Sequence, residues 1–447
     1  MSFPRYPKYK ASGVEWLGDV PEGWNIVPLK IAAFVAVSGI DKKFKDDEER
    51  IRFLGTDTVY SSERITTAIE LEECSASEDQ IRAFSLLAKD VVITKDSVVP
   101  TKIAVVSYVD QPPEQAVCGY HLALIRSRPG RAVGLFLFYA LKSTALAAYF
   151  LSEARGTTII GIGGGIIGKA TVPLPPLPEQ TAIAEFLDRE TAKIDELVAE
   201  QRRLMELLKE KRQAVISNAV TKGLNPHAPM KHSGIEWMGE MPTGWVVKRL
   251  KHISPFIAVG IVVNPSTYIA DVGLPFIYGG DIREGVIDFA NARRITSESS
   301  EVNSKTLLRT GDLLTVRVGA PGVTAVVPSE CDGGNCASVM LVRQGPFNSD
   351  WLCYAMNTKV VRFQVEVVKY GAAQEQFNIS HAVNFWVPVP PRTEQDAIAA
   401  FLACETLRFD TLTAEAQRAI DLLQERRTAL ISAAVTGQID VRQQARN

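Results

Sequence analysis

The segment that comes nearest to a cofactor-binding motif is the glycine-rich run Gly163-Gly-Gly-Ile-Ile-Gly-Lys-Ala170. It approaches the phosphate-binding loop GxxxxGK[ST] and also fits GxGxxG. Such a loop must lead directly into a helix, because the free N–H groups and the dipole of that helix face the phosphate. The chain instead continues as Thr171-Val-Pro-Leu-Pro-Pro176, which cannot be helical, and Ala170 removes the magnesium-binding hydroxyl. We therefore predict a glycine-rich turn or ligand-facing loop here, not a nucleotide site.

Other residues capable of chemistry are scattered. Asp110-Gln-Pro-Pro-Glu114 has the composition of the Asp-Pro-Pro-Tyr motif of amino methyltransferases, but Gln111 is inserted and the aromatic residue that would hold a flipped base is missing. The six cysteines form no CxxC pair and no zinc-ligand spacing, and the five histidines form no HExxH motif. The sequence predicts no catalytic residues, no metal site and no cofactor of its own.

Composition limits the class of protein. The 447 residues predict two to three domains, and the 46% hydrophobic content is that of a folded chain. The net charge of -2 excludes a uniformly basic nucleic-acid coat, but it does not exclude a local basic surface. The start, Met1-Ser-Phe-Pro-Arg5, lacks the apolar core of a secretory signal, and Lys142 interrupts the most apolar stretch, 132–151. We expect a cytoplasmic protein with free thiols and no membrane span.

The chain contains two long gapless repeats. Residues 12–30 return as 233–251 with 10 of 19 positions identical, at an offset of 221. Residues 175–221 return as 390–436 with 26 of 47 identical, at an offset of 215. A period above 200 residues is too long for a solenoid, so it indicates duplication of a whole domain with its connector.

Between the repeats lie two regions that differ in most side chains, residues 31–174 and 252–389, here called the first and second variable regions. Both contain short apolar runs separated by Pro and Gly, which predict strands and turns. A helix is expected near 134–152 and near 349–367. The pattern predicts an α+β fold for each region.

The repeated connectors predict two long helices with a heptad seam. Pro178 marks one start, while Gly223 and Gly437 mark the ends. The predicted helix-pairing residues are Leu187, Ile194, Leu197, Leu204, Leu208, Leu402, Phe409, Leu412, Leu423 and Leu430. Two copies in one chain favour intramolecular pairing over dimerisation. Basic residues outside the seam, such as Arg212 and Arg427, are predicted to bind partner subunits or to be solvated.

The Glu-Trp-x-Gly-x-x-Pro-x-Gly-Trp segment at Glu15–Trp24, the Pro-Pro-x-x-Glu-Gln start of a long helix at Pro175–Gln180, and their duplication resemble the DNA specificity (S) subunit of Type I restriction-modification systems. The resemblance covers essentially the whole chain. It implies a fold of two pseudo-symmetric target recognition domains separated by two long antiparallel helices that form an intramolecular coiled coil.

The resemblance also implies a function. Each target recognition domain reads one half of a bipartite asymmetric DNA site, and the paired helices set the unread spacer. The S subunit is non-catalytic and docks two modification (methyltransferase) subunits. These hold S-adenosylmethionine and methylate adenine, and restriction subunits complete an endonuclease that uses ATP and Mg2+. The implied partners are therefore double-stranded DNA and these subunits.

On this basis the chain divides into six parts: a conserved N-terminal segment (1–30), target recognition domain 1 (31–174), a conserved central helix (175–224), a repeated Trp-containing segment (225–251), target recognition domain 2 (252–389) and a conserved C-terminal helix (390–447). One departure from the family is visible. Members often carry a glycine-rich turn after the central strand, as Arg317–Gly322 does, whereas the first half has Lys95–Pro100 instead.

Residues that contact DNA should be side chains that can fork onto base edges, or cations that pair with phosphate, in predicted loops. In the first domain these are Lys95, Lys102, Arg155, Thr157, Thr158 and Lys169. In the second they are Arg283, Arg293, Arg294, Arg317, Lys369, Tyr370, Gln374, Gln376 and Asn378. The four tryptophans of the repeats, Trp16, Trp24, Trp237 and Trp245, are expected to pack against the helices instead of stacking on bases.

Two other classes of protein stay open. One is a two-module structural or adhesion scaffold, which would show no DNA binding with partners present. The other is an enzyme that uses the 163–168 loop, in which case Lys169→Ala would abolish nucleotide binding. Each variable region with its flank is electrically neutral, with 20 basic and 20 acidic residues in 1–174 and 14 of each in 223–389. We therefore expect the chain alone to bind DNA weakly, because the charge that neutralises phosphate must come largely from partners.

Overall fold

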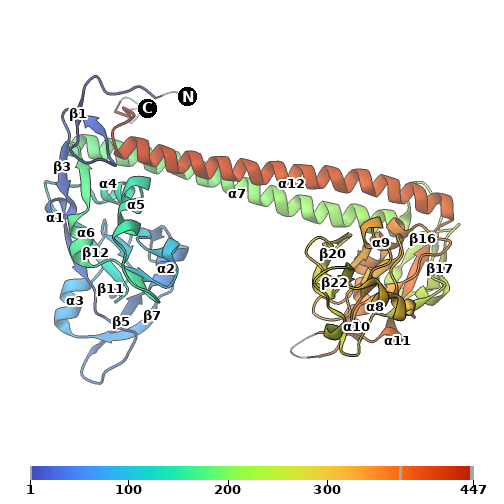
Figure 1. The fold of residues 1–447 in the computed structure, drawn as a ribbon. Helices are drawn as coiled ribbons and strands as arrows, with labels where there is room; N and C mark the ends of the chain where they lie inside the picture. Colours follow the sequence, from blue (N-terminus) through green and yellow to red (C-terminus); the bar gives the residue numbers. More distant parts are fainter. Residues whose placement is uncertain (1–2, 372–374, 443–447) are drawn as a thin grey trace. The chain divides into compact units, whose positions relative to one another are not determined.

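The computed structural model describes residues 3–371 and 375–442, and the chain divides into two units. The first unit comprises residues 1–201 and 418–447, and the second comprises 202–417. Each unit contains one variable region, one repeated Trp-containing segment, the start of one long helix and the end of the other (Figure 1). Each unit therefore combines one copy of the duplicated sequence with the end of the long helix that belongs to the other copy.

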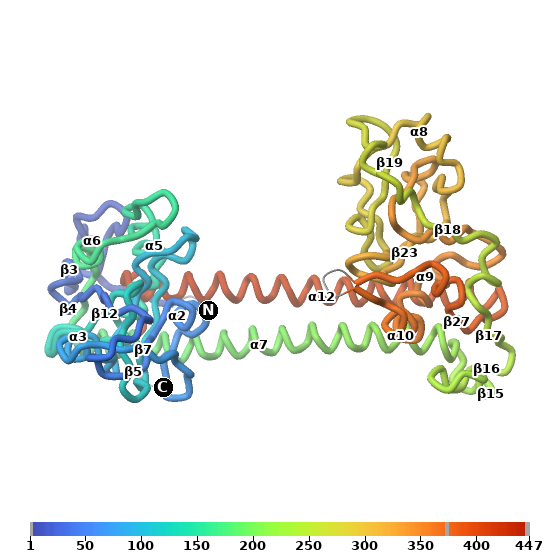
Figure 2. Tube along the Cα trace, turned by 90° about the horizontal axis from the view of Figure 1, so that it is seen from below, coloured from blue at the N-terminus to red at the C-terminus, as the bar shows by residue number. Residues whose placement is uncertain are grey.

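The long helices are α7, Leu177–Lys222, and α12, Arg392–Val435. A Pro-Pro pair precedes each helix, and each has a glutamate in its first turn. Gly223 and Gly437 follow the two ends with φ of +74° and +73°, the left-handed conformation that commonly terminates a helix. The two helices pack together, as Figures 1 and 2 show, and the predicted helix punctuation is confirmed.

The first variable region is built from a five-stranded sheet in the order β4-β12-β8-β10-β6 and a three-stranded sheet in the order β11-β5-β7. Its strands are β4 Ala33–Val37, β5 Glu49–Leu54, β6 Arg64–Ile65, β7 Glu72–Ala76, β8 Val91–Thr94, β9 Asp96–Ser97, β10 Val106–Val109, β11 Ala116–Cys118, β12 Leu122–Ser127 and β13 Ile160–Gly161. Its helices are α1 Leu29–Ala32, which begins in the preceding segment, α2 Thr56–Ser61, α3 Glu78–Phe84, η1 Pro100–Lys102, α4 Gly134–Leu141, α5 Thr144–Glu153 and α6 Gly164–Lys169.

The second variable region is built from a four-stranded sheet in the order β18-β26-β23-β24 and a three-stranded sheet in the order β22-β19-β25. Its strands are β18 Ile257–Val259, β19 Leu274–Ile277, β20 Ile282–Arg283, β21 Val286–Ile287, β22 Arg293–Ile295, β23 Leu313–Thr315, β24 Thr324–Val326, β25 Asn335–Cys336 and β26 Met340–Val342. Its helices are η4 Pro265–Tyr268, η5 Gly279–Asp281, α8 Ser297–Val302, η6 Ser304–Thr306, η7 Ser329–Cys331, α9 Ser349–Asn357, α10 Lys359–Val368 and α11 Ile379–Ala382.

The two variable regions share one strand plan. The central strand β8 lies antiparallel to β12 and β10, as β23 lies antiparallel to β26 and β24. In each smaller sheet the middle strand, β5 or β19, has one parallel and one antiparallel neighbour. The predicted pseudo-symmetric α+β fold is therefore confirmed, although most of the side chains differ between the regions.

The repeated segments connect the variable regions to the long helices. In the first unit β1 (Tyr9–Ala11) pairs with β2 (Asp19–Pro21), and β3 (Asn25–Pro28) pairs with β14 (Thr171–Leu174). In the second unit β15 (Met230–His232) pairs with β16 (Glu240–Pro242), and β17 (Val246–Arg249) pairs with β27 (Trp386–Val389), with η2 Glu236–Met238 and η3 Leu250–His252 between them. Each variable region is thus closed by a two-stranded ribbon that pairs a strand of the repeated segment before it with its own last strand.

The sequence prediction differs from the structure around residue 142. The single helix expected near 134–152 is two helices, α4 and α5, bent by 66°. The single helix expected near 349–367 is likewise two helices, α9 and α10, separated at Thr358. Ser143 caps α5 by accepting a hydrogen bond from the Leu146 amide, so the polar residues that interrupt the apolar run also break the helix. By length and composition this bent pair is the one candidate for a membrane span among the described residues, and no single helix qualifies there.

The seam between α7 and α12 follows the heptad pattern, but with one correction. Leu187, Ile194, Leu402, Phe409 and Leu430 are buried, and Leu208 and Leu423 are half-buried. By contrast Leu197, Leu204 and Leu412 are 51%, 43% and 37% exposed. These three residues do not lie in the seam, and their predicted role in helix pairing was wrong.

The seam needs a second residue between the positions that recur every seven residues. The prediction placed this second residue three positions after each recurring position, but in the structure it lies four positions after. Val198 and Ile420 are 7% and 4% exposed, and Met205 is half-buried. A spacing of four then three keeps the average of 3.5 residues that a helix pair requires. The heptad period alone does not distinguish the two spacings, because both give the same repeat.

Candidate nucleic-acid interface

A tryptophan and a glutamate tie each repeated segment to the start of a long helix. The indole Nε1 of Trp24 donates to Glu179 at 3.1 Å, and that of Trp245 donates to Glu394 at 2.9 Å. Both rings are 1% exposed, as the sequence predicted for packing residues. Trp16 and Trp237, in contrast, are 38% and 40% exposed, so the predicted packing of these two is only partial. The Trp and Glu residues of the repeated motifs therefore belong to the frame.

A buried glutamine continues this frame into each variable region. Gln180 accepts a hydrogen bond from the Val133 amide at 2.9 Å and donates to the carbonyls of Pro175 at 2.8 Å and Arg131 at 3.1 Å. Gln395 accepts from the Asn348 amide at 2.9 Å and donates to the Pro390 carbonyl at 2.9 Å. The Glu-Gln pair of each repeat therefore fixes the variable region on its helix.

In the first variable region two loops are joined by backbone hydrogen bonds. The segments 95–104 and 154–163, here called loop pair 1, meet where β9 pairs with β13 and where the Ile162 amide donates to the Lys95 carbonyl at 2.7 Å. Arg155 pairs with Gly161 through both backbone groups. Loop pair 1 gathers four of the predicted DNA-contacting residues, Lys95, Lys102, Arg155 and Thr157, together with Thr158.

The second variable region has a corresponding arrangement. The segments 316–323, 369–371 and 375–378, here called loop pair 2, meet where the Gly319 amide donates to the Glu375 carbonyl at 3.0 Å and the Phe377 amide donates to the Arg317 carbonyl at 3.2 Å. Tyr370 and Gln376 exchange two backbone hydrogen bonds of 2.9 Å. Loop pair 2 gathers Arg317, Lys369, Tyr370, Gln376 and Asn378. Gln374, also predicted to contact DNA, lies outside the described residues.

A polar hollow of about 650 Å³ adjoins loop pair 2. Its lining includes Tyr278, Asp281, Asn291, Arg293 and Val318, the last of which belongs to loop pair 2. The Arg293 guanidinium lies 4.2 Å from the centre of the Tyr278 ring. The Tyr278 hydroxyl is buried and has no hydrogen-bond partner among the described residues. The Tyr278 hydroxyl can therefore donate a hydrogen bond to a polar group of a ligand that enters the hollow, next to the stacked Arg293 guanidinium.

Sequence reasoning found Arg293 but missed Tyr278, Asp281 and Asn291. Burial raises the pKa of the Asp281 carboxyl, and Arg293 acts in the opposite direction. The available signal was the run Tyr278-Gly-Gly-Asp281 directly after β19, because a glycine pair after a strand leaves the backbone accessible to a ligand.

The other predicted residues lie apart from the loop pairs. Lys169 is exposed at the end of α6, which begins one residue after loop pair 1. Arg283 is exposed at the end of β20, and neither it nor Arg294 lines the hollow. Arg294 donates a long hydrogen bond to the Ala290 carbonyl, 3.5 Å. The glycine-rich run, predicted to be a turn or loop, is instead the short helix α6, so this prediction was wrong. The chain after α6 is the strand β14, so no helix follows the run, as the sequence predicted.

Acidic neighbours neutralise two of the loop cations. Lys95 forms an ion pair with Asp96. Lys369 lies 2.6 Å from Glu366 and 2.9 Å from Glu375, and its hydrogen bonds to both raise its pKa. Both lysines form ion pairs with carboxylates of the chain itself. Arg317, Arg293 and the polar side chains of the loops are therefore better placed to bind a ligand.

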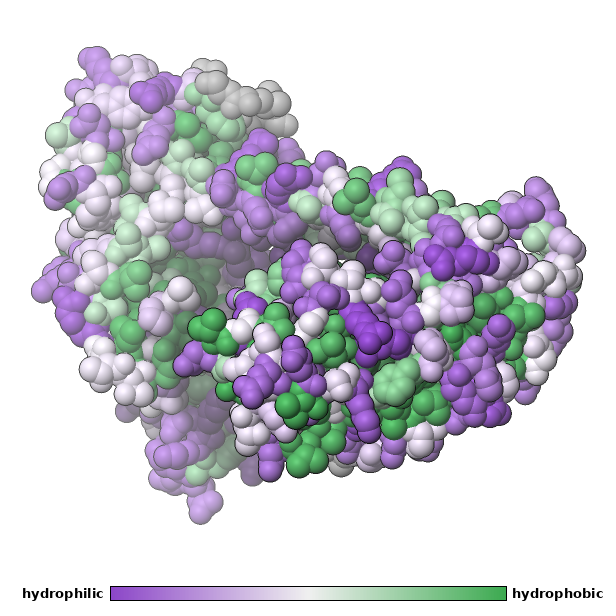
Figure 3. All heavy atoms as spheres, turned by 45° about the vertical axis from the view of Figure 1, so that its right-hand side comes forward, coloured by the Kyte–Doolittle hydropathy of each residue, from purple (hydrophilic) through white to green (hydrophobic). Residues whose placement is uncertain are grey.

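The remaining groups offer little catalytic chemistry in the described residues. Five of the six cysteines are buried, and burial raises the pKa of the thiols, to about 11 for Cys74 and about 12 for Cys336 and Cys353. Thiols with such pKa values are protonated near neutrality and are poor nucleophiles. Among the described residues no group of three or more His, Cys, Asp or Glu side chains could hold a metal ion. The face drawn in Figure 3 mixes hydrophilic and hydrophobic residues in small patches.

Residues 21–205 match the family described as the Type I restriction modification DNA specificity domain. A relative from Methanocaldococcus jannaschii, the putative type I restriction enzyme MjaX specificity subunit, is 23% identical over 95% of this chain and 96% of its own length. The type I restriction enzyme EcoBI specificity subunit of Escherichia coli is 25% identical over 70% of this chain and 67% of its own.

Two solved structures share the fold. A chain from a structure of the type I R-M system, described in terms of complex assembly and conformational transition, has a TM-score of 0.70 at 18% identity and covers 93% of this chain and 98% of its own. The HsdS subunit from Thermoanaerobacter tengcongensis has a TM-score of 0.53 at 17% identity, with 94% and 98% covered. The likeness therefore extends over both repeats.

Proposed function

Because this chain belongs to the DNA specificity subunit family of Type I restriction-modification systems, we propose that it reads the DNA sequence for a complex whose chemistry resides in other subunits. It is a non-catalytic subunit. The observation that carries the finer proposal is the pair of equivalent loop pairs. Each is held on the same Trp-Glu-Gln frame, yet the side chains of the two differ. Equivalent loops with different side chains suit the reading of two different half-sites.

We assign sequence reading to loop pairs 1 and 2 and to the hollow beside the second. A guanidinium can donate two hydrogen bonds to guanine, and a carboxamide can pair with adenine. Arg317, Gln376 and Arg293 have these side chains, while Lys102, Arg155, Thr157 and Tyr370 supply phosphate or base contacts. Lys95 and Lys369 join them when their internal ion pairs open.

The long helices connect these two readers. We propose that their paired length sets the unread gap of a bipartite asymmetric site. In this proposal the domain boundaries are those of the six parts 1–30, 31–174, 175–224, 225–251, 252–389 and 390–447. The repeated surfaces dock two modification subunits, one for each copy. S-adenosylmethionine, ATP and Mg2+ belong to the modification and restriction subunits, and the complex acts on double-stranded DNA in the cytoplasm.

The test is to co-express the chain with the modification subunit encoded beside it and to map methylated adenine by long-read sequencing. The expected result is a bipartite motif with one gap length. A continuous palindrome, or no methylation, would refute the proposal. Exchange of residues 31–174 for the corresponding region of a relative should change one half of the motif and leave the other half unchanged.

Point variants test the individual readers in the same assay. Arg317→Ala and Arg293→Ala should relax the second half of the motif by about 1–3 kcal/mol per lost base contact, roughly a tenfold loss of preference or more. Lys305→Ala removes an exposed cation outside loop pair 2 and is the matched control. An unchanged motif in both arginine variants would exclude these residues as base readers.

A further inference from the structure

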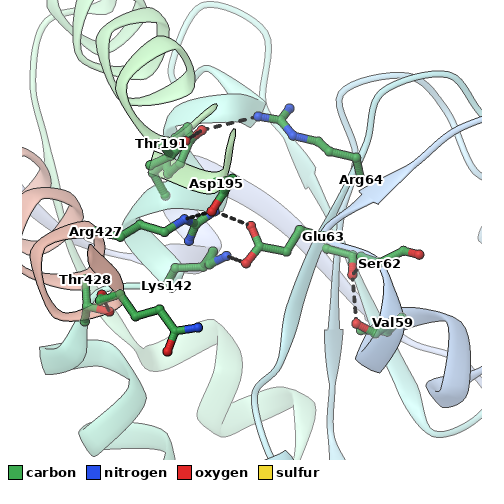
Figure 4. Close-up of polar contacts among 12 residues, drawn as sticks. Val59, Ser62, Glu63, Arg64, Lys142, Thr191, Asp195, Arg427 and Thr428 are labelled. Atoms are coloured by element: carbon green, nitrogen blue, oxygen red, sulfur yellow. Dashed lines mark hydrogen bonds and ion pairs between the residues drawn. The ribbon is translucent and has the colours of Figure 1, made fainter. Parts of the chain in front are cut away.

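In the first unit an arginine of α12 joins three elements. The Arg427 guanidinium donates to Glu63 of the first variable region at 2.8 Å and to Asp195 of α7 at 3.1 Å (Figure 4). Its side chain is only 15% exposed. Arg427 therefore contacts the partner helix and the variable region at once, and its predicted place on a free outer face was wrong.

The second unit repeats the arrangement with the helices exchanged. Arg212 of α7 lies 3.7 Å from Glu284 in the β20–β21 turn and 3.7 Å from Asp410 of α12. Arg212 and Asp410 are the counterparts of Arg427 and Asp195 in the helix repeat, at the offset of 215. We call each Glu-Arg-Asp set a triad. In two antiparallel helices, a step forward along one helix faces a step backward along the other. Contacts that belong to one register therefore join residues whose numbers have the same sum, and the two Arg-Asp pairs meet this condition.

The triads differ in strength. In the first unit the Lys142 ammonium also forms an ion pair with Glu63, and Figure 4 shows this carboxylate between Lys142 and Arg427. The counterpart of Lys142 is Asn357, which bonds to the backbone of Thr324 instead. Arg212, Glu284 and Asp410 then line a cavity of about 210 Å³. The first triad is therefore the tighter one.

A charged residue within an apolar helix seam is a known way to select one register, because a slipped register leaves the charge without its partner. The leucine seam repeats every seven residues, so apolar packing alone tolerates a slip of one heptad, about 10 Å. A DNA base pair rises about 3.4 Å, so such a slip equals about three base pairs. Sliding α7 against α12 moves one recognition domain relative to the other, because each domain is anchored to the start of a different helix.

We propose that the two triads are positioning residues that hold the helix register and seat each recognition domain on it, and so restrict methylation to one gap length. This inference rests on the proposed function. The triads do not touch the DNA in this scheme. They act on the spacing between the two loop pairs that do.

The experiment uses the full chain co-expressed with the modification subunit and a plasmid set in which both half-sites are separated by the native gap or by gaps changed by one to three base pairs. Wild type should methylate the native gap only. Arg427→Gln should raise the fraction of altered-gap sites methylated, relative to the native site, by about tenfold. Arg212→Gln should raise it less, because its ion pairs are longer. Arg418→Gln on α12 and Lys209→Gln on α7 remove exposed cations outside the triads and should change nothing.

Glu284→Gln separates positioning from folding. It leaves the Arg212 and Asp410 helix contact in place and removes the negative charge through which the recognition domain attracts Arg212. The change lies in a surface turn, where Gln213 of α7 also donates to Glu284 at 3.4 Å. Partial relaxation of the gap is expected, and Arg427→Lys should restore most of the stringency lost in Arg427→Gln. If the arginine variants and Glu284→Gln all keep the wild-type gap preference at reduced overall methylation, the triads only stabilise the fold and the inference fails. If wild type itself gives no bipartite motif, the proposed function fails first.

Discussion

Replacement of Gln180 by alanine removes three hydrogen bonds at once, one of them buried and two part-buried. The Val133 amide loses its acceptor, and the carbonyls of Pro175 and Arg131 lose their donor, in a place where the glutamine is fully buried. An unsatisfied buried backbone group costs about 1–3 kcal/mol, and water that enters the space left by the side chain offsets part of this. We expect a net loss of about 3 kcal/mol in the local stability of the first unit, with little change for the exposed control Thr181→Ala.

Hydrogen exchange followed by mass spectrometry measures this loss at the bond itself. A loss of about 3 kcal/mol corresponds to roughly a hundredfold faster exchange in a peptide that contains Val133. Gln395→Ala should accelerate exchange at Asn348 in the second unit, by less, because it breaks two hydrogen bonds instead of three. Exchange at Val133 that rises less than about threefold in Gln180→Ala, in a folded protein, would refute this account of the Glu-Gln motif.

Three further outcomes follow from the geometry. Val198→Ala should lower the free energy of unfolding, measured in urea, by about 2 kcal/mol, because Val198 is buried in the seam. Leu197→Ala, a larger truncation one residue away, should lower it by less than about 0.5 kcal/mol. The reverse order would show that Leu197, as first predicted, lies in the seam. Burial raises the pKa of the Glu63 carboxyl but neighbouring cations outweigh it, so the pKa lies below 4.5. The stability that this group contributes is present above about pH 4.5 and is lost as the pH falls through the pKa of the folded state. The free energy of unfolding, measured from about pH 6 to pH 3, should therefore depend less on pH in Glu63→Gln than in wild type. An equal pH dependence in the two proteins would contradict the assignment. Gly437→Ala places a Cβ 2.3 Å from Pro21 at a φ of +73°, so limited proteolysis should release the N-terminal segment faster than in wild type, and equal rates would count against this contact.

Much of the architecture could be read from the sequence because duplication and periodicity are local properties of the chain. The offsets of 221 and 215 identified the two halves, and the heptads with their flanking proline and glycine located α7 and α12. The helix near 134–152 was predicted as one element, since hydrophobicity does not reveal that Ser143 would act as a cap. Motif context also removed the glycine-rich run from the list of nucleotide sites.

The candidate interface was less predictable. Arg317, Tyr370 and Gln376 were found as loop residues, but only hydrogen bonds between loops distant in sequence bring them together. Tyr278 and Asp281 gave no strong signal because their role depends on the hollow that they line. Periodicity cannot predict such clusters, since loop conformation is decided by contacts far along the chain.

The sequence by itself determined that this protein consists of two copies of one unit, joined by two helices that pack through a heptad seam. Its motif residues, Trp24, Glu179 and Gln180 with their repeats, were visible as identities before any contact was known. Only the tertiary structure decided which seam positions are buried and that Arg212 and Arg427 are held in triads. The physical reason is that a repeat records which residues were duplicated, whereas the partner of a charge and the burial of a side chain depend on elements that the fold brings together.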